Sequence, residues 1–280
     1  MKYEEFLPSP NLQPYLERFF AISLTQEQPI RELIIPDGTH GILFVQQESF
    51  RRQSAFDEKD AHHLNKSYVF GQKSNAVYYS LEKSGLYCFG VKLRPNGLSA
   101  FTPVPADKIT DTFVEAPLLF GQQFKILEEQ VFDSPSIEQK IQRLESYFLE
   151  QLLGNLDEHQ QLAGQILAFI HQQKGQVSIA RLLEVFNIGY KRMERLFKKH
   201  VGLSPKAYCR IARFNATLFY QKKHPEENLT QLAYSAGYFD QMHFVKEVKH
   251  FTNLTPSAFY QQSLQAIGTH QRQSVAERFA

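Results

Sequence analysis

The chain has 280 residues, of which 42% are hydrophobic, including 24 Phe and 13 Tyr, so it has core material for two ordinary domains and is not intrinsically disordered. It begins without a signal-peptide pattern and contains no run of about 18 apolar residues, so we expect a cytoplasmic protein with no membrane partner. The net charge of +2 is unevenly spread: residues 1–169 hold 15 Lys and Arg against 22 Asp and Glu, whereas residues 170–280 hold 16 against 7, as in proteins whose one half binds nucleic acid.

Four runs rich in Ile, Val, Phe and Tyr predict β-strands in the first hundred residues. They are bounded by turn-forming sequences such as "PDG" and "RPNG". The runs are residues 30–35, 41–47, 76–81 and 85–95. The last run places apolar side chains on one face, namely Tyr87, Phe89, Val91 and Leu93, which predicts a sheet with one face on a core. Several short strands in series favour a small barrel or sandwich.

Residues 136–152 predict an amphipathic helix that begins at Ser136 as its N-cap. Its apolar stripe consists of Ile137, Ile141, Leu144, Phe148 and Leu152. The stripe either packs on the sheet or forms a dimer seam, because both arrangements bury the same face. The polar residues 153–161 that follow predict a hinge. The two cysteines, Cys88 and Cys209, match no metal or redox spacing and are interpreted as reduced packing residues.

The C-terminal part contains one pattern twice, in "GYKRMERLFKKHVGLSPKAY" at 189–208 and "GYFDQMHFVKEVKHFTNLTPSAF" at 237–259. At an offset of 51 residues, Met193 aligns with Phe244 and Pro205 with Pro256. A short apolar helix and a turn residue that tolerates positive φ, Asn187 or Gly237, precede each second helix. The sequence therefore predicts two helix-turn-helix units.

The second helix of each unit has an apolar and a cationic face. We expect Met193, Leu196, Phe197, Phe244, Val248 and Phe251 to be buried, and the Lys, Arg, Gln and His residues between them to be exposed. Arg and Lys bind guanine acceptors, Gln pairs with adenine, and further cations bind phosphates. These faces favour major-groove recognition over a merely solvated surface.

Residues 165–262 resemble the DNA-binding domain of the AraC/XylS family of bacterial transcription regulators. The resemblance rests on "MERLFKKHVGLSPKAYCRIARFNATLFY" and "AGYFDQMHFVKEVKHFTNLTPSAF". It implies that two recognition helices, joined by a linker helix over 204–221, enter adjacent major-groove segments of double-stranded DNA about one turn apart. The chain departs from the family pattern at Gly189, which replaces a Ser N-cap, and at Val248 and Asn253.

The resemblance also assigns the contacts to DNA. Base reading falls on Lys191, Glu194, Arg195, Gln241, Met242 and Lys246, and the full set of predicted DNA-binding residues adds Arg192, Lys198, His243 and Lys249. Arg213 and Phe214 match an Arg-Leu pair of the linker helix. There Arg213 either contacts DNA or braces the two units.

In the same family the other domain is often a cupin-like barrel that binds an effector or makes a dimer. We therefore expect a homodimer, RNA polymerase as a further partner, and a small-molecule effector bound by Arg31, Phe44, Tyr78, Phe89 and Lys92. Two alternatives stay open: a barrel used only for dimerisation, and a cupin-class enzyme fused to a DNA-tethering module. His40, His62 and His63 make a poor metal site, because adjacent strand residues point in opposite directions. We expect no enzyme activity, metal or cofactor.

The predicted fold class is α+β. A β-rich cupin-like barrel with a trailing helix occupies residues 1–155, an all-α domain with two helix-turn-helix units occupies residues 162–265, and residues 266–280 form a tail. The predicted function is transcription regulation by a DNA-binding activator or repressor.

Overall fold

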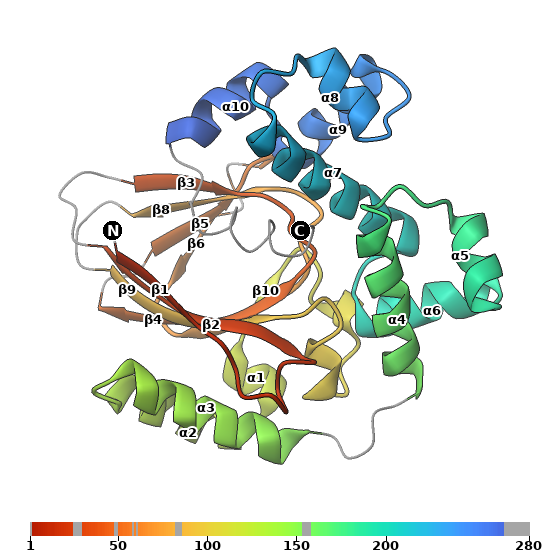
Figure 1. Cartoon of the computed structure of the whole chain (residues 1–280). Helices are drawn as coiled ribbons and strands as arrows, with labels where there is room; N and C mark the ends of the chain where they lie inside the picture. Colours follow the sequence, from red (N-terminus) through yellow and green to blue (C-terminus); the bar gives the residue numbers. More distant parts are fainter. Residues whose placement is uncertain are drawn as a thin grey trace.

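The computed structural model describes residues 2–24, 30–47, 50–57, 59, 61–81, 86–152 and 158–265 (Figure 1). Within these residues the strands are β1 Lys2–Phe6, β2 Leu16–Leu24, β3 Ile30–Ile34, β4 His40–Gln47, β5 Phe50–Ser54, β6 Ala61–Leu64, β7 Ser67–Phe70, β8 Val77–Leu81, β9 Leu86–Leu93 and β10 Phe113–Glu115. The predicted strands correspond to β3, β4, β8 and β9, and the other six were not predicted. The α+β fold class is confirmed.

The strands form two antiparallel sheets that face each other (Figure 1). One sheet has the order β1-β2-β9-β4-β7-β10 and the other the order β3-β8-β5-β6. In the larger sheet β9 lies between β2 and β4, with Val91 opposite both Phe19 and Ile42. Non-consecutive strands are therefore neighbours, and the connections between them carry the chain from one sheet to the other.

The larger sheet is buried on both faces, which corrects the expectation of one face on a core. Phe89, Val91 and Leu93 belong to a cluster on the outer face, whereas Cys88 belongs to a second cluster between the sheets. Tyr79 from the smaller sheet packs against that second cluster. A strand covered on both sides shows no simple alternation of apolar and polar residues.

Three helices, α1 Ala116–Phe120, α2 Gln122–Asp133 and α3 Ile137–Gln151, cover the outer face of the larger sheet (Figure 1). Ser136 caps α3 by accepting a hydrogen bond from the Gln139 amide, as predicted. Leu144 and Phe148 are fully buried, and the remainder of the predicted stripe packs against the same cluster. The stripe thus covers the sheet and is not a dimer seam.

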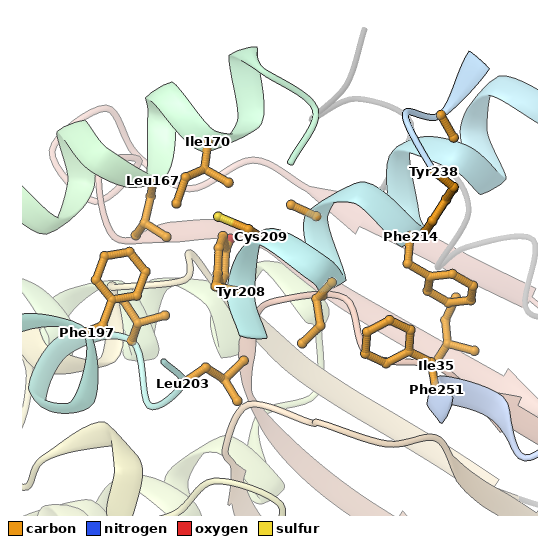
Figure 2. Packing of buried hydrophobic residues seen from close by; sticks show 14 of the residues in the cluster. Ile35, Leu167, Ile170, Phe197, Leu203, Tyr208, Cys209, Phe214, Tyr238 and Phe251 are labelled. Carbon is orange, nitrogen blue, oxygen red and sulfur yellow. The ribbon is translucent and has the colours of Figure 1, made fainter. Parts of the chain in front are cut away.

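The remaining helices are α4 Glu158–Gln172, α5 Ile179–Phe186, α6 Tyr190–His200, α7 Pro205–Lys223, α8 Leu229–Ser235, α9 Gln241–Thr252 and α10 Pro256–Gln265. Their apolar side chains form one cluster that includes Tyr208, Cys209 and Phe214 of α7 (Figure 2). Cys88 and Cys209 are both buried and free, as predicted. Burial raises the pKa of both thiols.

The helical cluster includes residues of the smaller sheet. Leu33, Ile35 and Ala76 are buried among the C-terminal helices, and the Ala76 amide donates a 2.8 Å hydrogen bond to the Phe251 carbonyl. Figure 2 shows Ile35 beside Phe214 and Phe251. The β-rich and helical parts therefore share one hydrophobic core at this place and do not form two separate cores.

The proposed limits 1–155 and 162–265 stay a prediction. Part of the predicted hinge, residues 153–157, and the whole tail 266–280 lie outside the described residues. In the parts of the chain that the structure describes, no helix has the length and apolar character to span a membrane.

Candidate nucleic-acid interface

The first helix-turn-helix unit consists of α5 and α6. Ser178 caps α5 by accepting from the Arg181 amide, and Asn187 ends it in the left-handed conformation with φ 47°. Helix α6 begins after Gly189, which has no side chain to accept a hydrogen bond from the first turn. The turn prediction at Asn187 is confirmed. The first turn of α6 has no side-chain cap, and the Arg192 amide donates a 3.0 Å hydrogen bond to the Gly189 carbonyl.

Helix α6 has the predicted two faces. Met193, Leu196 and Phe197 are buried. The exposed residues are Tyr190, Lys191, Arg192, Arg195, Lys198 and Lys199. Glu194 is half-buried, and its Oε1 accepts a 2.8 Å hydrogen bond from the Tyr190 hydroxyl. This contact raises the pKa of Tyr190 and holds both side chains at the start of the exposed face.

The second unit consists of α8 and α9 and is more completely capped. Asn228 and Gln231 form a capping box at the start of α8. Gly237 has φ 71°, as its predicted turn role requires. Asp240 accepts a 2.7 Å hydrogen bond from the His243 amide and so caps α9, while Asn253 ends α9 with φ 61°. A carboxylate at a helix N-terminus also interacts favourably with the helix dipole.

Helix α9 buries Phe244, Val248 and Phe251. Its exposed residues are Gln241, Met242, Lys246, Lys249 and His250. His243 differs from the prediction because it is half-buried, with its ring edge-on to Tyr238 at a centroid distance of 5.3 Å. The Gln241 Oε1 accepts a 2.8 Å hydrogen bond from the Thr230 hydroxyl, which orients the Gln241 amide at the start of the helix.

Linker helix α7 holds the two units at its two ends (Figure 1). Ser204 caps it by accepting from the Ala207 amide, and its 19 residues span about 28 Å. An ion pair fixes it to α9: the Arg210 guanidinium donates to both Glu247 oxygens, at 2.7 and 3.1 Å to Oε1 and 3.2 Å to Oε2. Arg213 lies 5.5 Å from the centre of the Tyr238 ring.

The ion pair to α9 was not predicted, because the only residue considered as a brace was Arg213, for which a DNA contact was the alternative. The available signal was Glu247, an acid on the apolar face between Phe244 and Phe251, in a half of the chain with few acids. An acid that is 7% exposed needs a cation, and Arg210 supplies it. The α7–α9 brace thus comes from Arg210, three residues before Arg213.

The five residues predicted to bind an effector do not meet at one place. Phe44 and Phe89 pack together on the outer face of the larger sheet, beneath α2. Lys92 points to the opposite face, because neighbouring strand residues alternate. The exposed Arg31 stacks on Tyr78 of the smaller sheet, with its guanidinium carbon 4.0 Å from the ring centre.

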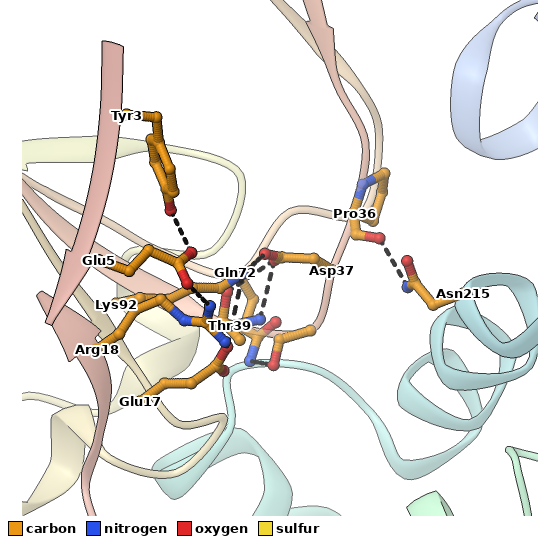
Figure 3. Close-up of polar contacts among 11 residues, drawn as sticks. Tyr3, Glu5, Glu17, Arg18, Pro36, Asp37, Thr39, Gln72, Lys92 and Asn215 are labelled. Atoms are coloured by element: carbon orange, nitrogen blue, oxygen red, sulfur yellow. Dashed lines mark hydrogen bonds and ion pairs between the residues drawn. The ribbon is translucent and has the colours of Figure 1, made fainter. Parts of the chain in front are cut away.

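Lys92 belongs to a polar network between the sheets that was not predicted (Figure 3). Its Nζ lies 2.9 Å from Asp37 Oδ2 and 4.0 Å from Glu17 Oε1. Arg18, which is 5% exposed, pairs with both Glu5 and Glu17. Cations and acids alternate through this network, so each buried charge has a partner of opposite sign.

His40 is the first residue of β4 and is 1% exposed. Burial, together with the nearby charge of Lys73, lowers its pKa to about 3. His62 and His63 lie on β6, exposed and away from such an environment. No group of three or more His, Cys, Asp or Glu able to hold a metal ion occurs among the residues that the structure describes.

The loop between β3 and β4 connects the polar network with linker helix α7. Asp37 accepts from the Thr39 amide and hydroxyl on the network side. On the other side, the Pro36 carbonyl accepts a 2.9 Å hydrogen bond from Asn215 Nδ2 (Figure 3). One short loop therefore contacts both the interior of the β-rich part and the helix that holds the two helix-turn-helix units.

Comparisons with known proteins agree with this arrangement of helices. Residues 182–262 match the model of a helix-turn-helix domain family, and residues 4–115 match a domain of unknown function. Over 94 residues the chain is 26% identical to an uncharacterized HTH-type transcriptional regulator of Haemophilus influenzae, covering 34% of this chain and 31% of that protein. It is 27% identical over 94 residues to the HTH-type transcriptional activator RhaS of an Enterobacter species, covering 33% and 34%.

The matched region spans about a third of the length of these curated relatives. Among solved structures, the fatty-acid-bound ToxT of Vibrio cholerae is 10% identical, with a TM-score of 0.47 over 86% of this chain and 94% of that one. The paired units, the linker helix and the match show that residues 182–262 form a helix-turn-helix domain of the AraC type.

Proposed function

We propose that this protein is a sequence-specific transcription regulator that reads two adjacent major-groove segments of double-stranded DNA. The observation that carries the proposal is the pair of helices α6 and α9, each buried on one face and cationic on the other, held at the two ends of α7. Two such surfaces on one chain suit a bipartite operator. Half-sites one helical turn apart are separated by about 34 Å, which α7 and the flanking helices can bridge.

In this proposal the exposed cations divide between bases and phosphates. Lys191 and Arg195 bind guanine acceptors in the first segment, while Gln241 pairs with adenine and Lys246 reaches a base in the second. Arg192, Lys198 and Lys249 bind phosphates. Glu194 accepts from a cytosine amino group, and the Tyr190 hydroxyl, which donates to Glu194, presets its orientation.

The β-rich part acts in this proposal as the regulatory part, in a cytoplasmic homodimer that contacts RNA polymerase. Support comes from the loop at residues 35–39, which contacts both the buried charges around Lys92 and the linker helix. A small molecule that binds between the sheets and changes the Lys92–Asp37 pair would act directly on that loop. Such an effector controls transcription only if it binds one arrangement of the two parts better than the other.

The proposal is tested by mapping bound DNA and transcripts in cells that carry the full-length chain. Arg195→Ala combined with Lys246→Ala should remove specific occupancy and the transcriptional response at neighbouring genes. The control is the double variant Lys59→Ala and Lys125→Ala, which removes two exposed cations of the β-rich part and changes the net charge by the same amount. Equal loss of occupancy in both double variants would mean that binding follows net charge alone and would contradict the proposal.

A further inference from the structure

Large apolar side chains are exposed around the start of α9, where a surface that binds DNA is expected to be polar. Phe239 is 86% exposed, Tyr234 63% and Met242 59%. Tyr234 lies near the end of α8, Phe239 directly before the N-cap Asp240, and Met242 in the first turn of α9. Exposed apolar side chains gathered at one place usually mark a binding surface.

The fold does not require Phe239. A residue directly before the N-cap often packs against the fourth helical residue, which here is the buried Phe244. That place is taken by Tyr238, whose ring lies 5.2 Å from the Phe244 ring. In the first unit the equivalent residue, Ile188, does pack against the helical core. Phe239 therefore points into solvent, whereas the equivalent residue of the first unit, Ile188, is packed.

Met242 lies on the same face of α9 as two cations. Lys246 and Lys249 follow it by four and seven residues, a spacing that places all three side chains on one side of a helix. The equivalent of Met242 in the first unit is Lys191. The second unit thus places the apolar Met242 beside Lys246 and Lys249, which attract an anionic partner. The first unit has the charged Lys191 at the equivalent position.

Duplex DNA offers one apolar group in the major groove, the C5-methyl group of thymine. We propose that Phe239 and Met242 contact thymine methyl groups, so that the second unit recognises an A·T segment by apolar contact beside the adenine that Gln241 pairs with. This inference rests on the proposed function of DNA recognition. The polyanionic partner is favoured because the apolar side chains are flanked by Lys246 and Lys249, which complement phosphate charge.

The proposal is tested with the full-length chain and the duplex recovered by selection from random DNA. Each thymine is replaced in turn by deoxyuridine, which lacks only the methyl group. We expect a loss of about four-fold in affinity at one or two positions of the second half-site. The same substitution in the first half-site should leave the affinity unchanged.

Protein variants locate the contact. With Met242→Ala and Phe239→Ser, binding should weaken and the deoxyuridine effect should disappear, since its partner has gone. With Lys246→Ala, binding should weaken but the deoxyuridine effect should persist. Both apolar residues are exposed, so their replacement leaves the fold intact, which circular dichroism checks.

Three outcomes would overturn the inference. If every deoxyuridine duplex binds as tightly as its parent, the methyl groups are not read, although the proposed function stands. If Met242→Ala and Phe239→Ser abolish transcription while DNA affinity is unchanged, the apolar surface binds a protein instead. If the chain selects no sequence at all, the proposed function fails and the inference fails with it.

Discussion

The side-chain amide of Asn215, in the middle of linker helix α7, donates a 2.9 Å hydrogen bond to the backbone carbonyl of Pro36 in the β3–β4 loop. Asn215 is 1% exposed, and its Nδ2 also lies 2.9 Å from the Ile211 carbonyl. The two partners of this contact are 179 residues apart in the chain. The helix that spaces the two units is therefore fastened to the β-rich part by a buried polar contact.

Replacement of Asn215 should loosen this attachment. Asn215→Ala leaves the Pro36 carbonyl without its donor in a buried place, which we expect to destabilise the protein by about 1–3 kcal/mol. Urea unfolding measures the loss, and hydrogen exchange should show faster exchange in the β3–β4 loop and α7. Unchanged protection of both segments would show that the contact does not hold them together.

The backbone of Gly38 packs closely against the side chain of Tyr208. Gly38 has φ 75°, and a Cβ at this position would meet three atoms of the Tyr208 side chain at 3.1–3.3 Å. Gly121 is a matched control, because it has φ 88° but no atom within 4 Å of the place that a Cβ would take. Gly121→Ala should cost about 1–3 kcal/mol for backbone strain alone, because φ 88° with ψ −176° is a conformation almost restricted to glycine.

Gly38→Ala should destabilise the protein through two effects, the positive φ and the close contact with Tyr208. Unfolding free energies of the two variants provide the comparison. We also expect Gly38→Ala, but not Gly121→Ala, to change DNA affinity, since Tyr208 belongs to α7. Equal DNA affinities of the two variants would mean that the contact between Gly38 and Tyr208 does not position α7.

The Arg210–Glu247 ion pair should contribute far more to the free energy of unfolding than an exposed ion pair does. Glu247 is 7% exposed, so Arg210→Met leaves a nearly buried carboxylate without its cation, and we expect a loss of about 2–4 kcal/mol. The exposed Arg181–Glu184 pair is the control, and Arg181→Met should cost less than about 0.5 kcal/mol.

A double-mutant cycle with Arg210→Met and Glu247→Gln isolates the coupling energy. Because the pair joins α7 to α9, Arg210→Met should also relax the spacing of the two units. Binding to duplexes with one base pair inserted between the half-sites should then fall less steeply than for the native chain. If Arg210→Met does not change the preferred distance between half-sites, apolar packing alone sets the spacing of the two units.

Acid should destabilise the protein through His40. Its pKa is lowered in the folded state to about 3, chiefly by burial, whereas an unfolded histidine titrates near 6.5. The unfolded chain therefore binds a proton that the folded chain does not. The contribution is fully present above pH about 6.5 and is lost progressively as the pH falls towards 3.

The His40 contribution is measured from unfolding free energies between pH 7.5 and 4.5. His40→Gln, which cannot titrate, should lose less stability over this range than the native chain, whatever its stability at pH 7.5. Parallel curves for the two proteins would show that the native histidine is accessible to protons. The neighbouring groups Lys73 and Asp37 act on His40 in opposite directions and are unchanged in both proteins.

The helical half could be predicted well from the sequence because its pattern is local. The repeat at an offset of 51 residues, the turn at Gly237 and the burial of Phe197 all follow from spacing within one or two helices. The Arg210–Glu247 pair could not be predicted in this way, since helical spacing on α7 does not reveal what α9 places opposite.

The interior of the β-rich half was the least predictable part. Lys92 looked like an anchor for a ligand, but its partner Asp37 comes from a loop 55 residues earlier in the chain. Arg18 follows Glu17 in a charged segment that resembles a surface, yet both side chains lie in the buried network. Which charges are paired inside a two-sheet structure depends on strand order, which the sequence pattern does not reveal.

The most direct test of the central claim is selection of bound sites from random duplex DNA by the full-length chain, repeated with Arg195→Ala and with Lys246→Ala. We expect a motif of two half-sites one helical turn apart. Each substitution should relax its own half at a cost of about 1–3 kcal/mol and leave the other half intact. Recovery of no motif, with binding that depends only on salt concentration, would contradict it.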